Sequence, residues 1–178
     1  MIKAFIIAAV TADGFIAKDA AHSAIWTSKE DKARFVELTK RAGVVIMGST
    51  TFKTLSRPLQ DRLNIVYTRK PPEAGVSVRP DFEKVEYTQA DPKDLLADLE
   101  ARGIKEVAIC GGSQIYTSFM KARVVDRVFL TIEPLFFGQG ITLFNEPLNH
   151  HLKPVGAKVN EATGTLLLEY KVEYHGDL

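Results

Sequence analysis

Short apolar runs of strand length recur along the chain, and each is followed by a glycine or a polar residue. Continuous runs of this kind are typical of strands that are covered on both faces of a parallel sheet. The pattern therefore predicts buried strands at residues 4–10, 44–47, 64–68, 107–110 and 128–132, with shorter strands near 76–78 and 85–87.

The clearest helical pattern follows Trp26. Thr27 and Glu30 have the spacing of a capping box, in which each side chain bonds a free backbone N–H of the first turn. Phe35 and Leu38 then recur on one face of the predicted helix, and charged residues cover the rest. We therefore expect an amphipathic helix that begins at Thr27.

Other helix starts are marked by proline and glycine. Asp91 and Pro92 predict a cap and a first helical residue, and Gly103 predicts the end of that helix. Shorter helices are expected after Gly48 and after Gly112. Residues 11–25 lack such periodicity, so we expect a loop there, either a lid over a site or an ordinary surface loop.

The C-terminal part of the chain alternates between apolar and polar residues. Residues 166–174 do so with period two, which predicts a half-exposed strand, and the run at 155–159 supplies a neighbour for an antiparallel edge. Strands that alternate with helices elsewhere predict an α/β fold. A length of 178 residues fits one domain, spanning residues 1–178.

Composition narrows the classes of function. Apolar residues make up 46% of the chain and charged residues 25%, with a net charge of +1, which gives no support for nucleic acid or an anionic membrane as partner. The N-terminal apolar run is too short to span a bilayer, so we expect a cytoplasmic protein. A single cysteine, Cys110, excludes an internal disulfide, and the histidines lack metal-ligand spacing, so no metal is expected.

Asp31 is an acid on the apolar face of the predicted helix, four residues before Phe35. A buried carboxylate needs a partner, so one interpretation is a carboxylate that waits for the hydrogen-bond donors of a ligand. The alternative is a solvated first-turn acid that favours the helix dipole and pairs with Arg34 or Lys32. Thr131 could support Asp31 if its strand packs against this helix, or could be an ordinary strand residue.

Glycines and hydroxyls follow several of the predicted strands. Gly48 precedes a hydroxyl-rich segment, the pair Gly111-Gly112 precedes Ser113, and Thr68 precedes two cations. Ligand sites of α/β proteins lie at the carboxyl ends of strands, where free N–H groups bind phosphates. A cradle for a dinucleotide is one interpretation, and simple caps and a tight turn are the other.

Together these features resemble the dihydrofolate reductase superfamily over nearly the whole chain. The matching residues occur in the family's order: Ile7 to Ala9, Trp26, Asp31, Phe35, Thr39, Val45 to Gly48, Thr51, Arg57 to Leu59, Arg62, Gly111-Gly112, Ile115-Tyr116, Leu130-Thr131 and Gly138. The resemblance implies a three-layer α/β domain with a mostly parallel eight-stranded sheet, an antiparallel C-terminal edge strand and about four helices. It also implies reduction of dihydrofolate to tetrahydrofolate by NADPH.

The resemblance also implies residue roles. Asp31 would hold the pterin with support from Thr131, Trp26 would hold a water and close the lid, and Tyr116 would contact the nicotinamide. The implied substrate site comprises Ile7, Ala9, Asp31, Phe35, Leu55, Arg57, Leu59, Arg62, Cys110 and Thr131, with Arg62 as clamp for the glutamate carboxylate. The implied cofactor site comprises Ala9, Ile16, Gly48, Ser49, Thr50, Thr51, Thr68, Arg69, Lys70, Cys110, Gly111, Gly112, Ser113, Gln114, Ile115 and Tyr116.

Departures from the family pattern leave alternatives open. Ser49 and Gln114 stand where arginines often bind the 2′-phosphate, so preference for NADPH rests on Arg69 and Lys70, and NADH is not excluded. Residues 11–17 are similar to the reductase domain of riboflavin biosynthesis, which would have little use for an arginine clamp. A non-catalytic nucleotide-binding protein is a third alternative. We expect a small-molecule substrate and a monomer rather than a dimer.

Overall fold

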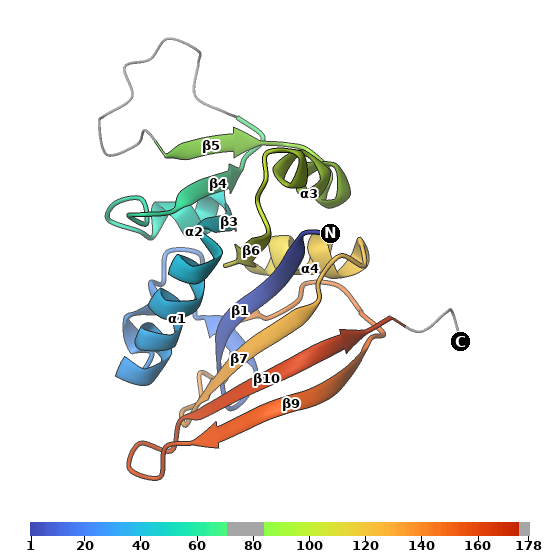
Figure 1. The fold of residues 1–178 in the computed structure, drawn as a ribbon. Helices are drawn as coiled ribbons and strands as arrows, with labels where there is room; N and C mark the ends of the chain where they lie inside the picture. Colours follow the sequence, from blue (N-terminus) through green and yellow to red (C-terminus); the bar gives the residue numbers. More distant parts are fainter. Residues whose placement is uncertain (71–83, 175–178) are drawn as a thin grey trace.

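The computed structural model describes residues 1–70 and 84–174. Its main sheet has eight strands in the order β5-β4-β3-β6-β1-β7-β10-β9, with β1 near the centre (Figure 1). The strands are β1 (Lys3–Thr11), β3 (Val44–Gly48), β4 (Leu63–Tyr67), β5 (Val85–Thr88), β6 (Glu106–Ile109), β7 (Arg127–Glu133), β9 (His151–Val159) and β10 (Leu166–Glu173). The predicted strand near residues 76–78 lies outside the described residues.

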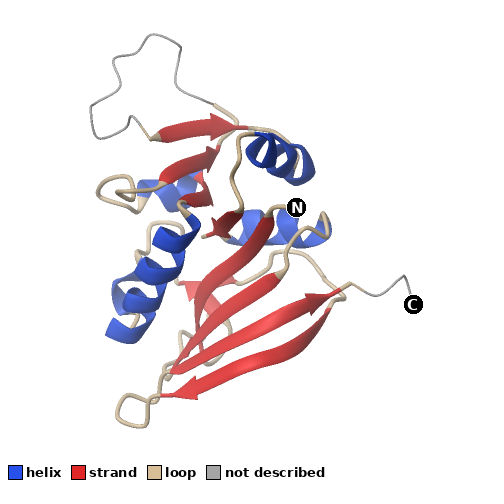
Figure 2. Cartoon of the chain, in the orientation of Figure 1, coloured by secondary structure: helices blue, strands red, loops and turns tan. Residues whose placement is uncertain are grey.

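Helices cover both faces of this sheet, and Figure 2 shows the three layers. They are α1 (Lys29–Ala42), α2 (Ser49–Lys53), α3 (Pro92–Ala101) and α4 (Ser113–Lys121). Phe5 and Ile7 of β1 point to the core beneath α1 and α2, whereas Ile6 points to the larger core beneath α3 and α4. The continuous apolar run of β1 is therefore explained by burial on both sides, as predicted.

The sheet changes from parallel to antiparallel at its C-terminal end. Strands β5, β4, β3, β6, β1 and β7 pair in parallel, β10 pairs antiparallel with β7, and β9 pairs antiparallel with β10. Every residue of β9 is exposed. The predicted α/β class and antiparallel edge are confirmed, with two antiparallel strands instead of one at that edge.

The start of α1 differs from the predicted capping box. Ser28 is the N-cap, and its Oγ accepts a hydrogen bond from the Asp31 N–H at 3.2 Å. Thr27 lies before the helix and donates to the Ala24 carbonyl, while Glu30 bonds Asn160 instead of the cap. The cap lies one residue later than predicted because Thr27 closes the short 3₁₀ helix that precedes α1, and no box forms because the Ser28 N–H donates to Glu133.

Asp91 also behaves differently from its predicted role. It occupies the N-cap position of α3, and Pro92 follows at the first helical residue, but the Asp91 side chain makes no capping bond. The position of the helix is therefore confirmed, and the expected capping contact is wrong. Proline alone accounts for this helix start, because its fixed φ suits the first turn.

Residues 11–25 contain more structure than the predicted loop. Strand β2 (Phe15–Ala17) pairs with β8 (Ile141–Thr142), and a 3₁₀ helix covers Ala24–Trp26. The Asp13 carboxylate accepts hydrogen bonds from the backbone N–H groups of Phe137 and Gly138. The segment is therefore attached to residues 137–142. Strand β2 has only three residues, which is too short to give a periodic pattern in the sequence.

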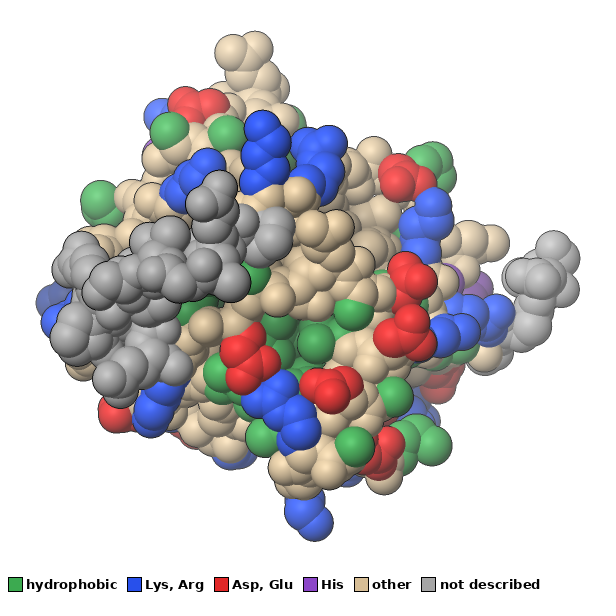
Figure 3. Space-filling view, turned by 90° about the horizontal axis from the view of Figure 1, so that it is seen from above, with side chains coloured by type: hydrophobic (Ala, Val, Ile, Leu, Met, Phe, Trp, Pro, Cys, Tyr) green, Lys and Arg blue, Asp and Glu red, His purple; other side chains and the backbone are tan. Residues whose placement is uncertain are grey.

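The outer surface carries mixed charge. Among the described residues on the face that Figure 3 shows, acidic and basic side chains lie beside one another instead of forming one dense basic patch. Arg102, for example, pairs with both Glu86 and Asp98. Within residues 1–70 and 84–174, no helix is long and apolar enough to cross a membrane.

Candidate active site

A cavity of about 780 Å³ lies where the parallel strands end. Its wall begins with Ala8 and Ala9 of β1, Gly48 at the end of β3 and Tyr67 at the end of β4. The carboxyl ends of parallel strands in an open α/β sheet are the usual place for a ligand. The cavity therefore coincides with the edge of the sheet where the sequence pattern placed phosphate-binding groups.

Most of the predicted site residues meet in this cavity. The predicted residues that line it are Ile7, Ala9, Ile16, Trp26, Asp31, Phe35, Gly48, Ser49, Thr50, Thr51, Thr68, Arg69, Cys110, Gly111, Gly112, Ser113, Gln114, Ile115 and Tyr116. They come from β1, β2, β3, α1, α2, α4 and the segments between the elements. One continuous hollow thus contains both the acid and the glycine-rich and hydroxyl-rich segments.

Other predicted residues lie away from the cavity lining. Leu55 and Leu59 pack in the core beneath α1 and α2, Arg57 is exposed, and Lys70 is exposed after β4. Thr131 is buried behind Asp31 and hydrogen-bonds its carboxyl. The structure therefore gives Thr131 the supporting contact that was predicted for it, without placing it in the cavity wall.

Arg62 is the largest departure from the predicted site. Its side chain is 6% exposed, and its guanidinium donates to the Thr39 hydroxyl at 2.7 Å and to the Gln60 carbonyl at 2.8 Å. These bonds hold the connection before β4 against α1. The guanidinium is used inside the protein, so the prediction of a carboxylate clamp at this position is not supported by its placement.

Asp31 is buried at one end of the cavity, with 8% of its surface exposed. Burial raises the pKa of its carboxyl, and hydrogen bonds from Thr131 and Thr27 oppose this only in part. The nearby Glu133 raises the pKa further, and Arg34 lowers it. The interpretation as a solvated first-turn acid is therefore wrong, and Asp31 is an acid that holds its proton more tightly than usual.

Lys32 has a role that the sequence did not reveal. Its Nζ donates to the carbonyls of Ile25 at 3.1 Å and Thr27 at 2.9 Å. These two carbonyls flank Trp26, which lines the cavity. Lys32 thus attaches the segment that carries Trp26 to the first turn of α1, instead of pairing with Asp31.

The Lys32 attachment can be tested through Trp26, which is the single tryptophan of the chain. We expect Lys32→Met to increase the quenching of Trp26 fluorescence by iodide, because the segment loses two hydrogen bonds to its anchor. Lys29→Met, on the same helix turn at an exposed site, is the matched control. Equal quenching in wild type, Lys32→Met and Lys29→Met would contradict the anchoring role.

The glycine pair brings three elements into close contact. The Gly111–Gly112 peptide bond is cis, and Gly111 has a φ of +112°. A Cβ at Gly111 would lie 3.1 Å from the Tyr116 hydroxyl oxygen, and one at Gly112 would lie 3.2 Å from Thr51 Oγ1. Tyr116 and Thr51 thus approach the turn closely, and the glycines leave backbone at the cavity wall where side chains would otherwise stand.

Tyr116 lines the cavity but its hydroxyl is engaged. The hydroxyl donates to the Ile7 carbonyl at 2.8 Å, and burial raises its pKa well above the ordinary value. This bond ties α4 to β1 across the site. Tyr116 is thus built to hold the wall of the cavity in place, and its proton is not available at neutral pH.

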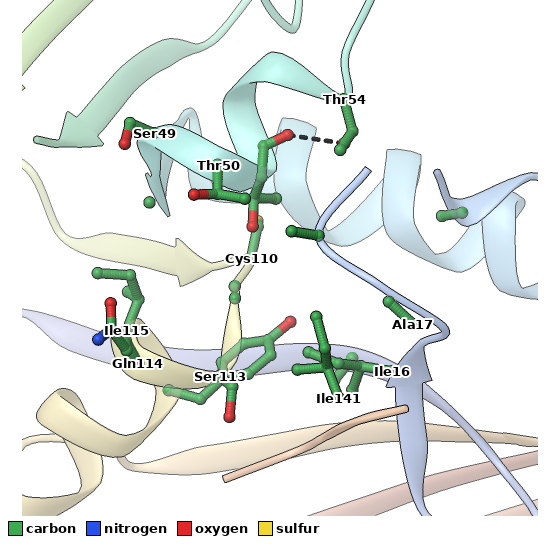
Figure 4. A pocket seen from close by; sticks show the side chains of 18 of the residues that line it. Ile16, Ala17, Ser49, Thr50, Thr54, Cys110, Ser113, Gln114, Ile115 and Ile141 are labelled. Atoms are coloured by element: carbon green, nitrogen blue, oxygen red, sulfur yellow. Dashed lines mark hydrogen bonds between the residues drawn. The ribbon is translucent and has the colours of Figure 1, made fainter. Parts of the chain in front are cut away.

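Hydroxyl groups of α2 and the start of α4 form another part of the cavity wall. Figure 4 shows Ser49 and Thr50 of α2 above, Ser113 and Gln114 at the start of α4 below, and Ile16 beside Ile141 across the cavity. Backbone N–H groups at a helix start bind phosphate groups well. Among the described residues that line the cavity, Arg69 is the only Lys or Arg side chain.

Three buried polar atoms of the lining residues lack partners within the described structure. They are Trp26 Nε1, the Tyr67 hydroxyl and Ser113 Oγ. Buried polar groups are almost always hydrogen-bonded, so atoms without partners at a cavity wall indicate contacts that a ligand completes. Together with the exposed glycine backbone, they fit the pyrophosphate and hydroxyl groups of a dinucleotide cofactor.

Several lining residues were not predicted. They are Ala8, Ala17, Asp19, Ala20, His22, Ala24, Thr27, Thr54, Tyr67, Thr88, Gln89 and Ile141. Thr88 and Gln89 follow β5, so the rule that parallel strands end at one edge could have found them. The residues of the 11–25 segment lie in the predicted loop, whose interpretation as a lid over a site named none of them except Ile16, and Ile141 reaches the cavity through the β2-β8 pairing.

Comparison with known proteins was consistent with this geometry. The model of the RibD C-terminal domain family matches residues 3–163. Dihydrofolate reductase type 3 of Salmonella typhimurium is 33% identical over 128 residues, which cover 71% of this chain and 68% of that protein. The family match extends over the strands and helices that form the cavity.

Solved structures share the fold at low sequence identity. A diaminohydroxyphosphoribosylaminopyrimidine deaminase/5-amino-6-(5-phosphoribosylamino)uracil reductase from Thermotoga maritima matches with a TM-score of 0.76 and 17% identity, over 96% of this chain and 56% of that chain. A pyrimidine reductase-like protein from Corynebacterium diphtheriae matches with a TM-score of 0.75 and 18% identity, over 98% and 93% of the two chains. These likenesses concern the fold.

Proposed function

Because the chain belongs to the RibD C-terminal domain family, we propose that it is an NADPH-dependent reductase of a phosphoribosylamino-pyrimidine in riboflavin synthesis. The observation that supports this substrate over dihydrofolate is the placement of Arg62. A folate reductase needs a cation for the glutamate carboxylate, and Arg62 is buried with its Nε bonded to the Gln60 carbonyl and its Nη1 bonded to the Thr39 hydroxyl.

The substrate end of the cavity suits a pyrimidine with a sugar phosphate. Asp31 offers carboxyl oxygens to N–H groups of the ring, and Phe35 lines the same end. His22 Nδ1 accepts from the Lys18 N–H at 3.1 Å, so the other ring nitrogen of a neutral His22 is a donor. His22 would supply this donor to a phosphate without a guanidinium, whereas the Thr54 hydroxyl already donates to the Thr51 carbonyl at 2.7 Å.

The other end of the cavity suits NADPH. Gly111, Gly112 and the start of α4 would hold the pyrophosphate, Tyr67 and Ser113 would complete their hydrogen bonds on it or on the sugars, and Arg69 would face a phosphate. When bound, the cofactor supplies a hydride. Ile16 and Ile141 close the cavity from the β2-β8 side and exclude water from the reacting atoms (Figure 4).

Catalysis by this chain would rest on positioning and on one proton. The bond from Tyr116 to the Ile7 carbonyl keeps the two walls at a fixed separation, so that the rings of cofactor and substrate stack. The ribosylamino group of such a substrate opens to an imine, and reduction of its C=N bond needs a hydride at the sugar carbon and a proton at the nitrogen. Asp31 lies at this end and, with its raised pKa, can hold a proton near the substrate nitrogen.

Dihydrofolate remains the second candidate substrate. The buried pair of Asp31 and Thr131 also suits the amino group and ring nitrogen of a pterin, and the relative from Salmonella typhimurium is a dihydrofolate reductase. A folate tail would then need a partner other than Arg62. The pyrimidine substrate has no glutamate tail, so it needs no partner in place of Arg62 among the described residues.

A substrate comparison separates the two candidates. We expect purified protein to oxidise NADPH, followed by its absorbance, when the phosphoribosylamino-pyrimidine is added and to remain near the background rate with dihydrofolate. Trp26 fluorescence, recorded in parallel, reports cofactor binding whether or not turnover occurs. Turnover of dihydrofolate alone would reverse the assignment of substrate, and cofactor binding without turnover of either would favour a non-catalytic protein.

A further inference from the structure

Glu133 is a second buried acid near the site. It is the last residue of β7, is 3% exposed and does not line the cavity. Its Oε1 accepts from the Ser28 N–H at 2.7 Å and its Oε2 accepts from the Thr165 hydroxyl at 2.8 Å. Both bonds come from neutral donors, so the charge of this carboxylate is not cancelled by them.

Glu133 reaches the active site through the first turn of α1. Ser28, which donates to Glu133, is the N-cap of that helix, and its Oγ accepts from the Asp31 N–H. Thr131, two residues before Glu133 on the same strand, hydrogen-bonds the Asp31 carboxyl. Strand β7 therefore contacts Asp31 directly through Thr131 and indirectly through Glu133 and Ser28.

The charges around Asp31 come from two elements. Glu133 on β7 opposes a negative charge on Asp31, and Arg34 on α1 favours it. The Arg34 guanidinium donates to the Leu168 carbonyl at 2.7 Å and also interacts electrostatically with Glu169. Its positive charge therefore acts on several groups and not on Asp31 alone. Two acids buried close together disfavour the state in which both are ionised.

We propose that Glu133 is a positioning residue of the active site, which fixes Asp31 through Ser28 and places a second negative charge behind it. The negative charge of Glu133 favours the protonated form of Asp31, so Asp31 binds a proton at a higher pH than it would without Glu133. The consequence for turnover rests on the proposed reductase function. The effect on Asp31 itself exists in the free protein.

The test is a titration of the Asp31 carboxyl by ¹³C NMR in protein labelled at aspartate Cγ, with the signal assigned by its loss in Asp31→Asn. Glu133→Gln keeps the shape, accepts from Ser28 through its carbonyl and donates to Thr165, but removes the charge. We expect the pKa of Asp31 to fall by about one pH unit in this variant. Glu86→Gln, which loses a surface ion pair on β5, is the control and should leave it unchanged.

An Asp31 titration that is the same in wild type and folded Glu133→Gln would overturn the proposal. If Glu133→Gln does not fold, Thr165→Val replaces it, because it removes the hydroxyl that holds Glu133 Oε2 and leaves the carboxylate free to move away from Ser28 and Asp31. We expect the pKa of Asp31 to fall in this variant too, and an Asp31 titration equal to that of wild type would overturn the proposal. Neither readout needs a substrate. If only the proposed function is wrong, the protein will show no turnover, but Glu133→Gln will still lower the pKa of Asp31.

Discussion

Asp31→Asn lowers the turnover number at neutral pH by on the order of a hundredfold or more in our expectation. The amide preserves the shape of the side chain and its bonds with Thr131 and Thr27, but it cannot hold a transferable proton and presents an N–H to the ring donors of the substrate. Steady-state kinetics with NADPH and the pyrimidine substrate measure this. A rate within a few-fold of wild type would end the role assigned to Asp31.

The same variant should be more stable than wild type at neutral pH. Because burial raises the pKa of Asp31 above the ordinary 3.8, the folded state binds its proton more tightly than the unfolded state. The contribution of Asp31 to the free energy of unfolding therefore falls as the pH rises from 3.8 through its raised pKa. Asparagine does not ionise, so Asp31→Asn does not lose this stability. Thermal melts of both proteins at pH 7 check this, and a lower melting temperature for Asp31→Asn would contradict the burial of a charge.

Gly111→Ala should weaken cofactor binding by about tenfold or more. A residue with a Cβ is strained at a φ of +112°, at a cost of roughly 1–3 kcal/mol, and the added carbon would lie 3.1 Å from the Tyr116 hydroxyl. The turn or Tyr116 must then move, which disturbs the wall that would hold the pyrophosphate. Titration of NADPH, followed by Trp26 fluorescence, gives the dissociation constant.

A matched glycine controls for the loss of backbone freedom. Gly156 lies on β9, where an added Cβ would meet only the Glu169 Cβ at 4.0 Å, which is ordinary contact. Gly156→Ala should therefore bind NADPH as wild type does. Similar dissociation constants for Gly111→Ala, Gly156→Ala and wild type would show that the glycine pair is a simple tight turn, the alternative interpretation of the sequence.

The fold could be predicted from the sequence because its signals are local. Burial of β1 on both faces gives an unbroken apolar run, and Pro92 marks a helix start whatever surrounds it. Charged residues were harder to assign. Asp31 and Arg62 have partners that are set by the tertiary fold, and spacing alone did not tell a buried acid from a solvated one.

Two features of the site differ from what the local sequence suggests, and they have a common physical origin. Arg62 follows a polar connection that suggests an exposed side chain, yet Thr39 on α1 accepts its guanidinium in the interior. The 11–25 segment has no periodicity of its own, and its short strand exists because Ile141 and Thr142 pair with it from 124 or more residues away. Contacts between distant segments decide both, and no local pattern encodes them.

The proposed function requires hydride transfer from NADPH to a phosphoribosylamino-pyrimidine in this cavity. Mass spectrometry of the product formed with NADPH that carries deuterium at C4 of the nicotinamide, using each of the two labelled diastereomers, tests this step. We expect one diastereomer to give the reduced phosphoribosylamino-pyrimidine with one deuterium on the sugar carbon, and Asp31→Asn to form little of it. Reduced pyrimidine without deuterium from either diastereomer, or label found only in tetrahydrofolate, would contradict it.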